Sequence, residues 1–130
     1  MGIVNIVATG IDLIECERIR EIWRRHGDRL TDRLLTPAES AYVRRHRNFV
    51  PRLAGRFAAK EAVLKVLGTG WRGKVAWQDM QILNDGDGRP HLELAGECQR
   101  IAHELGITDI LISITHTENY AAATAIGIGG

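Results

Sequence analysis

The stretch that decides the fold of this chain is RLAGRFAAKEAVLKVL, residues 52–67. Pro51 precedes it and Gly68 follows it, which is the order in which these two residue types begin and end helices. The sequence therefore predicts a helix over residues 51–67. At about 100° per residue, apolar side chains cover two opposite sides of it, namely Leu53, Phe57, Leu64 and Leu67 on one and Ala59, Ala62, Val63 and Val66 on the other. Such a helix is largely buried.

Three charged residues interrupt the apolar surface of this helix. Lys60 falls inside one apolar stripe, Glu61 lies at its edge, and Lys65 lies beside Glu61. An ordinary pair between Glu61 and Lys65, four residues apart and worth about 0.2–0.5 kcal/mol, would explain two of these charges. Because it leaves Lys60 unexplained, we favour a functional role for this charged group.

A second charge in apolar surroundings is Asp12, in the segment GIDLI over residues 10–14. It follows a short apolar run at 3–8 that we expect to be a buried strand. A buried, unpaired carboxylate costs several kcal/mol, so Asp12 should be exposed, should cap the next helix, or should bind a cation. The sequence leaves these alternatives open.

Carboxylates on two separate elements, Asp12 and Glu61, together with Lys65 and Arg56, have the composition of a phosphate-bound Mg²⁺ site. Mg²⁺ takes oxygen ligands, typically one or two carboxylates supplemented by substrate phosphates and water, and the basic side chains would neutralise the remaining phosphate charge. Zinc is disfavoured, since no set of cysteines and histidines has ligand spacing.

His116 ends a further expected strand. A histidine in this position can reach a cleft, where it binds phosphate or accepts a proton. A hydrogen-bonding role in the turn is the more common alternative, and the residue by itself does not decide between the two.

The first expected helix carries a basic surface. Arg18, Arg25 and Arg29 lie near one line with Ile22 beside them, provided that the helix continues past Gly27. An apolar residue rimmed by arginines suits an acidic, amphipathic partner helix. A solvated basic face is the alternative.

Outward from the central helix, the chain alternates between apolar runs and capped helices. Thr36, Pro37 and Glu39 form a strong helix start. We expect strands over 3–8, 75–83, 91–94, 110–115 and 120–126, and helices over 15–26, 37–46, 51–67 and 97–105. This β-α-α-α-β-β-α-β-β order predicts an α+β domain with a largely antiparallel sheet, a single domain over residues 1–130.

The composition excludes several classes of protein. Apolar residues make up 45% and charged residues 25% of the chain, ordinary values for a soluble globular protein, and no apolar run is long enough to span a membrane. Without a recognisable signal peptide, Cys16 and Cys98 are expected to be reduced thiols of a cytoplasmic protein. The net charge of +1 and the lack of aromatic residues among the arginines argue against nucleic-acid binding.

Three ordered motifs carry a resemblance to a known family. They are GIDLIE at 10–15 followed by Arg18-Ile19, RFAAKEAVLKVLGTG at 56–70, and SITHT at 113–117 followed by Tyr120-Ala121. Together they resemble the holo-[acyl-carrier-protein] synthases, the short, trimeric type of the 4′-phosphopantetheinyl transferase superfamily. The similarity covers nearly the whole chain and implies the α+β fold of that superfamily, with active sites in the clefts between subunits. Val66 departs from it, where the family usually has a small residue.

The resemblance implies roles for the charged residues identified above. Asp12 and Glu61 would hold Mg²⁺ against the diphosphate of coenzyme A, and Lys65 would contact its phosphates. Arg56 and His116 would bind the nucleotide phosphate end.

Further site residues follow from the same resemblance. Arg44 and Arg45 match a basic pair that can reach the 3′-phosphate. The resemblance also implies that Gly68 lines the site, although a helix end explains this glycine equally well. Arg18 and Arg25 would dock the acidic recognition helix of an acyl carrier protein.

The reaction implied is transfer of 4′-phosphopantetheine from coenzyme A to a carrier serine, in support of fatty acid biosynthesis. The serine hydroxyl attacks the β-phosphorus and 3′,5′-ADP leaves. The sequence leaves three alternatives for the general base: a water bound to the metal, Glu61 acting through a water, and His116. Alternatives are the same chemistry on a dedicated polyketide or polyunsaturated-fatty-acid synthase carrier, and a non-catalytic module that binds coenzyme A or a nucleotide.

Overall fold

The computed structural model describes residues 2–69 and 75–130. Its elements are β1 Asn5–Glu15, α1 Cys16–His26, α2 Asp28–Leu34, α3 Pro37–Val43, α4 Val50–Leu67, a 3₁₀ turn Trp77–Asp79, β2 Met80–Asn84, β3 Pro90–Leu94, α5 Gly96–Glu104, β4 Asp109–His116 and β5 Tyr120–Gly129. The predicted α+β class and element order are confirmed, with one further short helix, α2.

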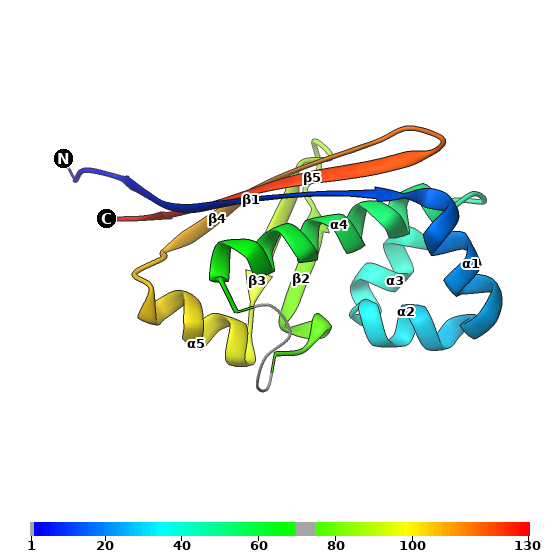
Figure 1. The fold of residues 1–130 in the computed structure, drawn as a ribbon, viewed down its shortest axis with the longest axis horizontal. Helices are drawn as coiled ribbons and strands as arrows, with labels where there is room; N and C mark the ends of the chain where they lie inside the picture. Colours follow the sequence, from blue (N-terminus) through cyan, green and yellow to red (C-terminus); the bar gives the residue numbers. More distant parts are fainter. Residues whose placement is uncertain (1, 70–74) are drawn as a thin grey trace.

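The strands form two antiparallel sheets. Strands β1, β5 and β4 lie in that order in one sheet, and β2 pairs with β3 in a separate hairpin. Figure 1 shows the long α4 running along one face of the three-stranded sheet, with α1 to α3 at one end and α5 at the other. The contact is close at Gly10, where a Cβ atom would lie 2.1 Å from the carbonyl oxygen of Ala62. Only a glycine in β1 allows this approach.

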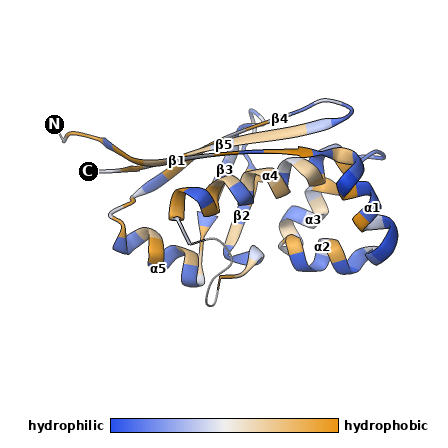
Figure 2. Cartoon of the chain, viewed as in Figure 1, coloured by the Kyte–Doolittle hydropathy of each residue, from blue (hydrophilic) through white to orange (hydrophobic). Residues whose placement is uncertain are grey.

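Helix α4 forms the centre of the core, as its apolar pattern predicts. Fourteen of its eighteen residues are buried. Its first half packs with α1, α2 and α3, and its second half packs with α5 and the start of β4. Hydrophilic residues gather on α1 and α2, as Figure 2 shows, which agrees with the arginine-rich composition of that segment. The core thus fixes α4 and the direction in which each of its side chains leaves the helix.

Several predicted boundaries are wrong at the N-terminal side of the chain. The strand expected over 3–8 runs from Asn5 to Glu15, so Asp12 lies within β1 instead of after it. The backbone of β1 pairs with β5 along nearly all of this length, and that long-range pairing overrides the break suggested by Gly10. Gly27, with φ 54°, ends α1 at His26 as predicted and separates it from α2.

The expected strand over 75–83 begins later than predicted. Trp77–Asp79 form a 3₁₀ turn, and extended pairing starts only at Met80. The strong helix start at Thr36 is confirmed, because the Glu39 N–H donates to Thr36 Oγ1 over 3.3 Å and the Thr36 N–H donates to Glu39 Oε1 over 2.9 Å. None of the helices within residues 2–69 and 75–130 has the length and hydropathy required to cross a membrane.

Candidate functional site

The first group of site residues lies where β1 passes over α4. Lys65 Nζ donates to the carbonyl oxygen of Ile11 over 2.6 Å and lies 3.4 Å from Asp12 Oδ1. The Asp12 side chain is 18% exposed, against 53% for Lys65. Asp12 lies inside β1, where its backbone pairs with β5, and Glu15 occupies the N-cap position of α1. The interpretation of Asp12 as a helix cap is therefore wrong.

Glu61 belongs to the same face of α4 as Lys65, one helical turn earlier, and it is half-buried. Asp12 and Glu61 therefore supply carboxylate oxygens from two elements beside one ammonium group. In the part of the chain that the structure describes, no three or more His, Cys, Asp or Glu side chains gather into a metal site. Two carboxylates with free positions for phosphate and water fit Mg²⁺ and do not fit a closed structural site.

The second group lines a pocket of about 210 Å³ on another side of α4. Arg56 is 4% exposed; its Nη2 donates to the carbonyl oxygen of Ile82 over 3.3 Å and to Asn84 Oδ1, and its guanidinium carbon lies 4.8 Å from the centre of the Tyr42 ring. Burial lowers the pKa of Arg56, with Glu39 partly opposing the effect. Arg56 Nε is buried without a hydrogen-bond partner. A buried cation with a spare donor next to a cavity is suited to an anionic ligand.

His116 lines the same pocket as Arg56, as the predicted pairing of these residues requires. Arg52, one turn before Arg56 in α4, lines it as well. The pKa of His46 is lowered by burial and by the positive charges of Arg52 and Arg45. The sequence interpretation missed Arg52 and His46. The spacing of Arg52 and Arg56, four residues apart on a helix, was the signal that pointed to Arg52.

The basic pair at 44 and 45 is divided between two environments. Arg44 Nη2 donates to Asp28 Oδ1 over 2.7 Å and to Thr31 Oγ1 over 2.8 Å, and so ties α3 to α2. The Arg45 guanidinium lies 5.9 Å from the ring centre of Tyr42, which lines the pocket. A 3′-phosphate role for either arginine stays a prediction, with Arg45 the better placed.

Gly68 is the left-handed residue that ends α4, with φ 71° and its N–H donating to the carbonyl oxygen of Leu64. A helix end accounts for this glycine without any ligand. Its role in lining the site stays a prediction, and Gly70 of the same motif lies outside the described residues.

The two groups lie on opposite flanks of α4. Strands β1 and β4 are the outer strands of the sheet, and two strand spacings separate them by about 9.6 Å. Asp12 and His116 come from these outer strands, and both belong to the set of alternate residues that faces α4. In the helix, Arg56 is rotated by about 140° from Glu61 and 180° from Lys65. Within one chain, α4 therefore stands between the carboxylate group and the arginine pocket.

Lys60 has a structural role and not the functional role that the sequence suggested. Its Nζ donates to Glu39 Oε1 and to the carbonyl oxygen of Leu34, both over 2.7 Å, and both charged side chains are 0% exposed. Burial lowers the pKa of Lys60, whereas the Glu39 carboxylate raises it. The carboxylate belongs to the helix start at Thr36 and could not be identified as a partner from local sequence.

The basic surface of α1 agrees in part with the prediction. Arg18 and Arg25 are exposed, Ile22 is half-buried and Ile19 is fully buried, so the helix presents both arginines to solvent and packs Ile19 against the core. Arg29 lies in α2, beyond the break at Gly27, and does not continue the line. The docking of a partner on Arg18, Ile22 and Arg25 stays a prediction.

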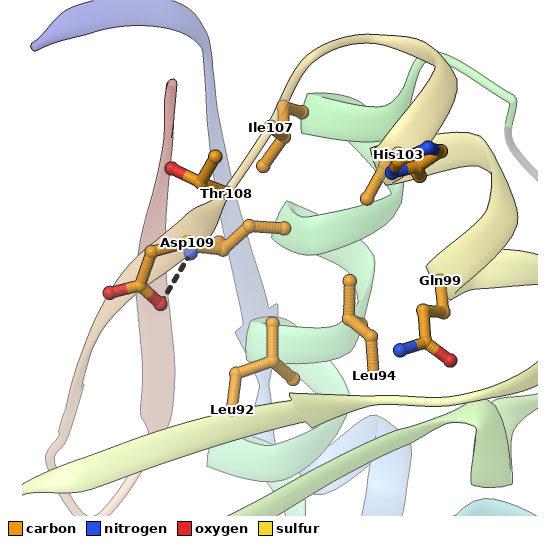
Figure 3. Close-up of a pocket in the computed structure, with 9 residues that line it drawn as sticks. Leu92, Leu94, Gln99, His103, Ile107, Thr108 and Asp109 are labelled. Carbon is orange, nitrogen blue, oxygen red and sulfur yellow. Dashed lines mark hydrogen bonds between the residues drawn. The ribbon is translucent and has the colours of Figure 1, made fainter. Parts of the chain in front are cut away.

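A further pocket, of about 410 Å³, lies between β3, α5 and the start of β4 (Figure 3). Leu92 and Leu94 of β3 and Ile107 give it an apolar lining, Gln99 and His103 line it from α5, and Asp109 lines it from the start of β4. It contains none of the predicted site residues.

Comparisons with known proteins agree with this fold. A sequence profile described as the 4′-phosphopantetheinyl transferase superfamily matches residues 8–125. A holo-[acyl-carrier-protein] synthase of Solibacter usitatus is 48% identical over 121 residues, covering 93% of this chain and 97% of that protein. A solved acyl carrier protein synthase of Plasmodium yoelii with ADP bound is 30% identical, with a TM-score of 0.88 and 99% of both chains covered. One from Helicobacter pylori in complex with coenzyme A is 25% identical, with a TM-score of 0.81 over 92% of this chain and 99% of that one. The chain belongs to the 4′-phosphopantetheinyl transferase superfamily and, within it, to the holo-[acyl-carrier-protein] synthase family.

Proposed function

We propose that this enzyme transfers 4′-phosphopantetheine from coenzyme A to a serine of an acyl carrier protein, with Mg²⁺, and releases 3′,5′-ADP. The observation that carries the proposal is the division of charge around α4. One flank offers two carboxylates beside Lys65, and the other offers the buried Arg56 next to a pocket. A metal-bound diphosphate suits the first flank, and a nucleotide phosphate suits the second. Coenzyme A, named as the ligand of the relative from Helicobacter pylori, carries both kinds of group, and 3′,5′-ADP, named for the one from Bacillus anthracis, carries the nucleotide phosphates.

The residues of this chain have separate tasks in the transfer. Asp12 and Glu61 would hold the Mg²⁺, which when bound would stabilise the negative charge that develops on 3′,5′-ADP as it leaves. Lys65, whose Nζ already donates towards Asp12, can turn to donate to the same phosphate oxygens. Glu61 and His116 are the side chains that can accept the proton of the serine hydroxyl. Arg56 binds the nucleotide phosphate end of coenzyme A and so orients the diphosphate for attack.

The same geometry supports a homotrimer with shared sites. A coenzyme A molecule needs both charged groups, and α4 separates them within one chain, so two chains meeting edge to edge would complete each site. The outward face of the sheet is apolar and uncovered: Ile11 is 65%, Leu13 66% and Leu111 52% exposed. Burying this face in a trimer would remove a patch that a monomer would otherwise expose to water.

The proposed setting is the cytoplasm, in the pathway of fatty acid biosynthesis. An acidic helix of the carrier protein would dock on Arg18, Ile22 and Arg25 of α1. The exposure of both arginines and the half-burial of Ile22 between them support this docking.

Intact-mass spectrometry of an apo acyl carrier protein tests the proposal. Incubation with this enzyme, coenzyme A and Mg²⁺ should add one phosphopantetheine to the carrier, and either EDTA or Asp12→Ala should abolish the addition. Asn5→Asp, at the distant start of β1, serves as a control and should leave the yield unchanged. A His116→Ala variant with an unchanged rate and pH profile would exclude His116 as the base.

Two alternative functions give different results in the same assay. If several carriers stay unmodified although coenzyme A binds, the chain is a binding module or serves a carrier not supplied. Addition to a polyketide-type carrier alone would identify a dedicated partner. The pair of carboxylates beside Lys65 favours the transferase function, because a module that only binds a nucleotide does not require two carboxylates to hold a metal ion.

A further inference from the structure

Asn84, the last residue of β2, connects two parts of the arginine pocket. Its Oδ1 accepts a hydrogen bond from Arg56 Nη2, and its Nδ2 donates to the carbonyl oxygen of Gly88 over 2.8 Å. Gly88 belongs to the turn between β2 and β3, and it lines the pocket together with Asn84 and Arg56. Both polar ends of the Asn84 amide are thereby used within the protein. The side chain is occupied in holding its neighbours and not in reading a ligand.

The turn that Asn84 holds is itself rigid. Asp85 Oδ1 accepts from the N–H groups of Asp87 and Arg89, each over 2.9 Å, and Asp85 Oδ2 lies 2.8 Å from His91 Nε2. The Gly88 N–H also donates to the Asp85 carbonyl oxygen over 2.9 Å. Asp85 therefore sets the shape of the turn, and Asn84 attaches that shape to Arg56.

The partners of Arg56 are all electrically neutral. Its hydrogen bonds go to the carbonyl oxygen of Ile82 and the amide of Asn84, and its planar group stacks on the ring of Tyr42. Among the described residues, no carboxylate lies within ion-pair distance of Arg56. A carboxylate at position 84 would hold the guanidinium equally well, but it would also compensate its charge at contact distance. A neutral amide holds Arg56 in place and leaves its charge available.

We propose that Asn84 is a positioning residue of the coenzyme A site, which fixes Arg56 through a neutral acceptor so that the guanidinium charge is available to the phosphate of the nucleotide. The inference rests on the proposed function and adds a determinant of affinity to it. Asn84 acts through Arg56 and does not itself touch the reacting atoms.

Three substitutions separate charge from turn geometry. Asn84→Asp keeps an acceptor for Arg56 and adds a compensating charge. Asn84→Ala removes the tether without adding charge, and Asp85→Ala loosens the turn while leaving the partners of Arg56 unchanged. Asn5→Asp adds the same charge at the far end of β1 and is the matched control. Each variant is measured by calorimetry with 3′,5′-ADP, with coenzyme A and with dephospho-coenzyme A, and by steady-state transfer to the carrier.

The expected result is a graded loss of affinity that depends on the charge of the ligand. Asn84→Asp should weaken 3′,5′-ADP and coenzyme A by about 10- to 100-fold, the range expected for losing one hydrogen bond between charged groups. The loss should be smaller for dephospho-coenzyme A, which lacks the 3′-phosphate. Asn84→Ala, which removes the tether of Arg56, should cost about 5-fold, and Asp85→Ala, which leaves the partners of Arg56 unchanged, about 2-fold or less. In Asn84→Asp the KM for coenzyme A should rise while kcat stays within about 2-fold, because the reacting diphosphate lies on the other flank of α4.

Two results would overturn the inference. One is binding of 3′,5′-ADP by Asn84→Asp within about 2-fold of the wild type; the other is an equal loss in Asn84→Asp and Asp85→Ala. If Asn84→Asp lowers the melting temperature too far to be measured, equal losses in Asn84→Ala and Asp85→Ala overturn it instead. Failure of the proposed function is recognised separately, because the wild-type enzyme would then fail to modify any carrier, whether or not it binds coenzyme A.

Discussion

Replacing Glu39 by glutamine should strongly destabilise this protein, because Glu39 accepts from three donors in the middle of the core. Oε1 accepts from Lys60 Nζ over 2.7 Å and from the Thr36 N–H over 2.9 Å, while Oε2 accepts from the Ile82 N–H over 3.0 Å. Glutamine has one acceptor oxygen and would direct an NH₂ group at a donor. It would also leave the Lys60 ammonium without its counter-charge at 0% exposure.

The size of the effect follows from the burial of both groups. Removing one partner of a buried ion pair costs about 3–5 kcal/mol, because the other charge stays buried and uncompensated. A chain of 130 residues has an unfolding entropy of about 270 cal/mol/K, so each kcal/mol lowers the melting temperature by about 4 °C. The Glu39→Gln variant should therefore melt roughly 11–18 °C below the wild type near neutral pH.

The loss of stability in Glu39→Gln should depend on pH. Burial lowers the pKa of Lys60 and the Glu39 carboxylate raises it, so in Glu39→Gln that pKa should fall further. A lysine whose folded pKa lies below its unfolded value binds fewer protons when folded, so stability rises with pH between the two values. The deficit of Glu39→Gln should thus be smaller at pH 9 than at pH 6.

The melting temperatures are measured by circular dichroism at both pH values and at fixed protein concentration. Lys60→Met and the double variant Glu39→Gln/Lys60→Met complete a mutant cycle, in which the double variant should be more stable than the sum of the single losses implies. Additive losses, or a Glu39→Gln deficit below about 1 kcal/mol at pH 6, would refute the argument that this pair is a coupled core contact.

Other predictions concern the packing, the pocket and the thiols. Gly10→Ala should destabilise the protein by roughly 1–3 kcal/mol or more in chemical denaturation, since its Cβ would meet the Ala62 carbonyl oxygen at 2.1 Å; an unchanged midpoint would contradict the close approach of β1 and α4. Burial and neighbouring cations such as Arg52 lower the pKa of His46, so binding of an anion should raise that pKa. The complex should then take up protons on binding as the pH falls towards 6.5, and calorimetry in buffers of different ionisation enthalpy should detect this uptake. Burial raises the pKa of the Cys98 thiol to about 12, so native protein at pH 8 should resist iodoacetamide while denatured protein reacts; rapid native labelling would contradict this.

Local sequence determined the helices whose signals are short-range. The capping residues at Thr36 and the left-handed Gly68 act on their immediate backbone, and both ends were predicted correctly. The two-sided apolar pattern of residues 52–67 likewise determined that α4 would be buried. The position of Asp12 inside a strand was not predictable in this way, because pairing with β5 more than 100 residues later extends β1 past Gly10.

For the site, the sequence by itself determined which residues are chemically unusual, and the tertiary structure decided what each does. Lys60 and Lys65 are both lysines in an apolar helix, but the fold places Glu39 against Lys60 and Asp12 near Lys65. Asn84 shows no signal in the chain; its role comes from the fold of β2 across α4, which sets it against Arg56. A residue's type and spacing determine its propensity and charge, whereas the partner that compensates a buried charge is fixed only when distant segments pack together.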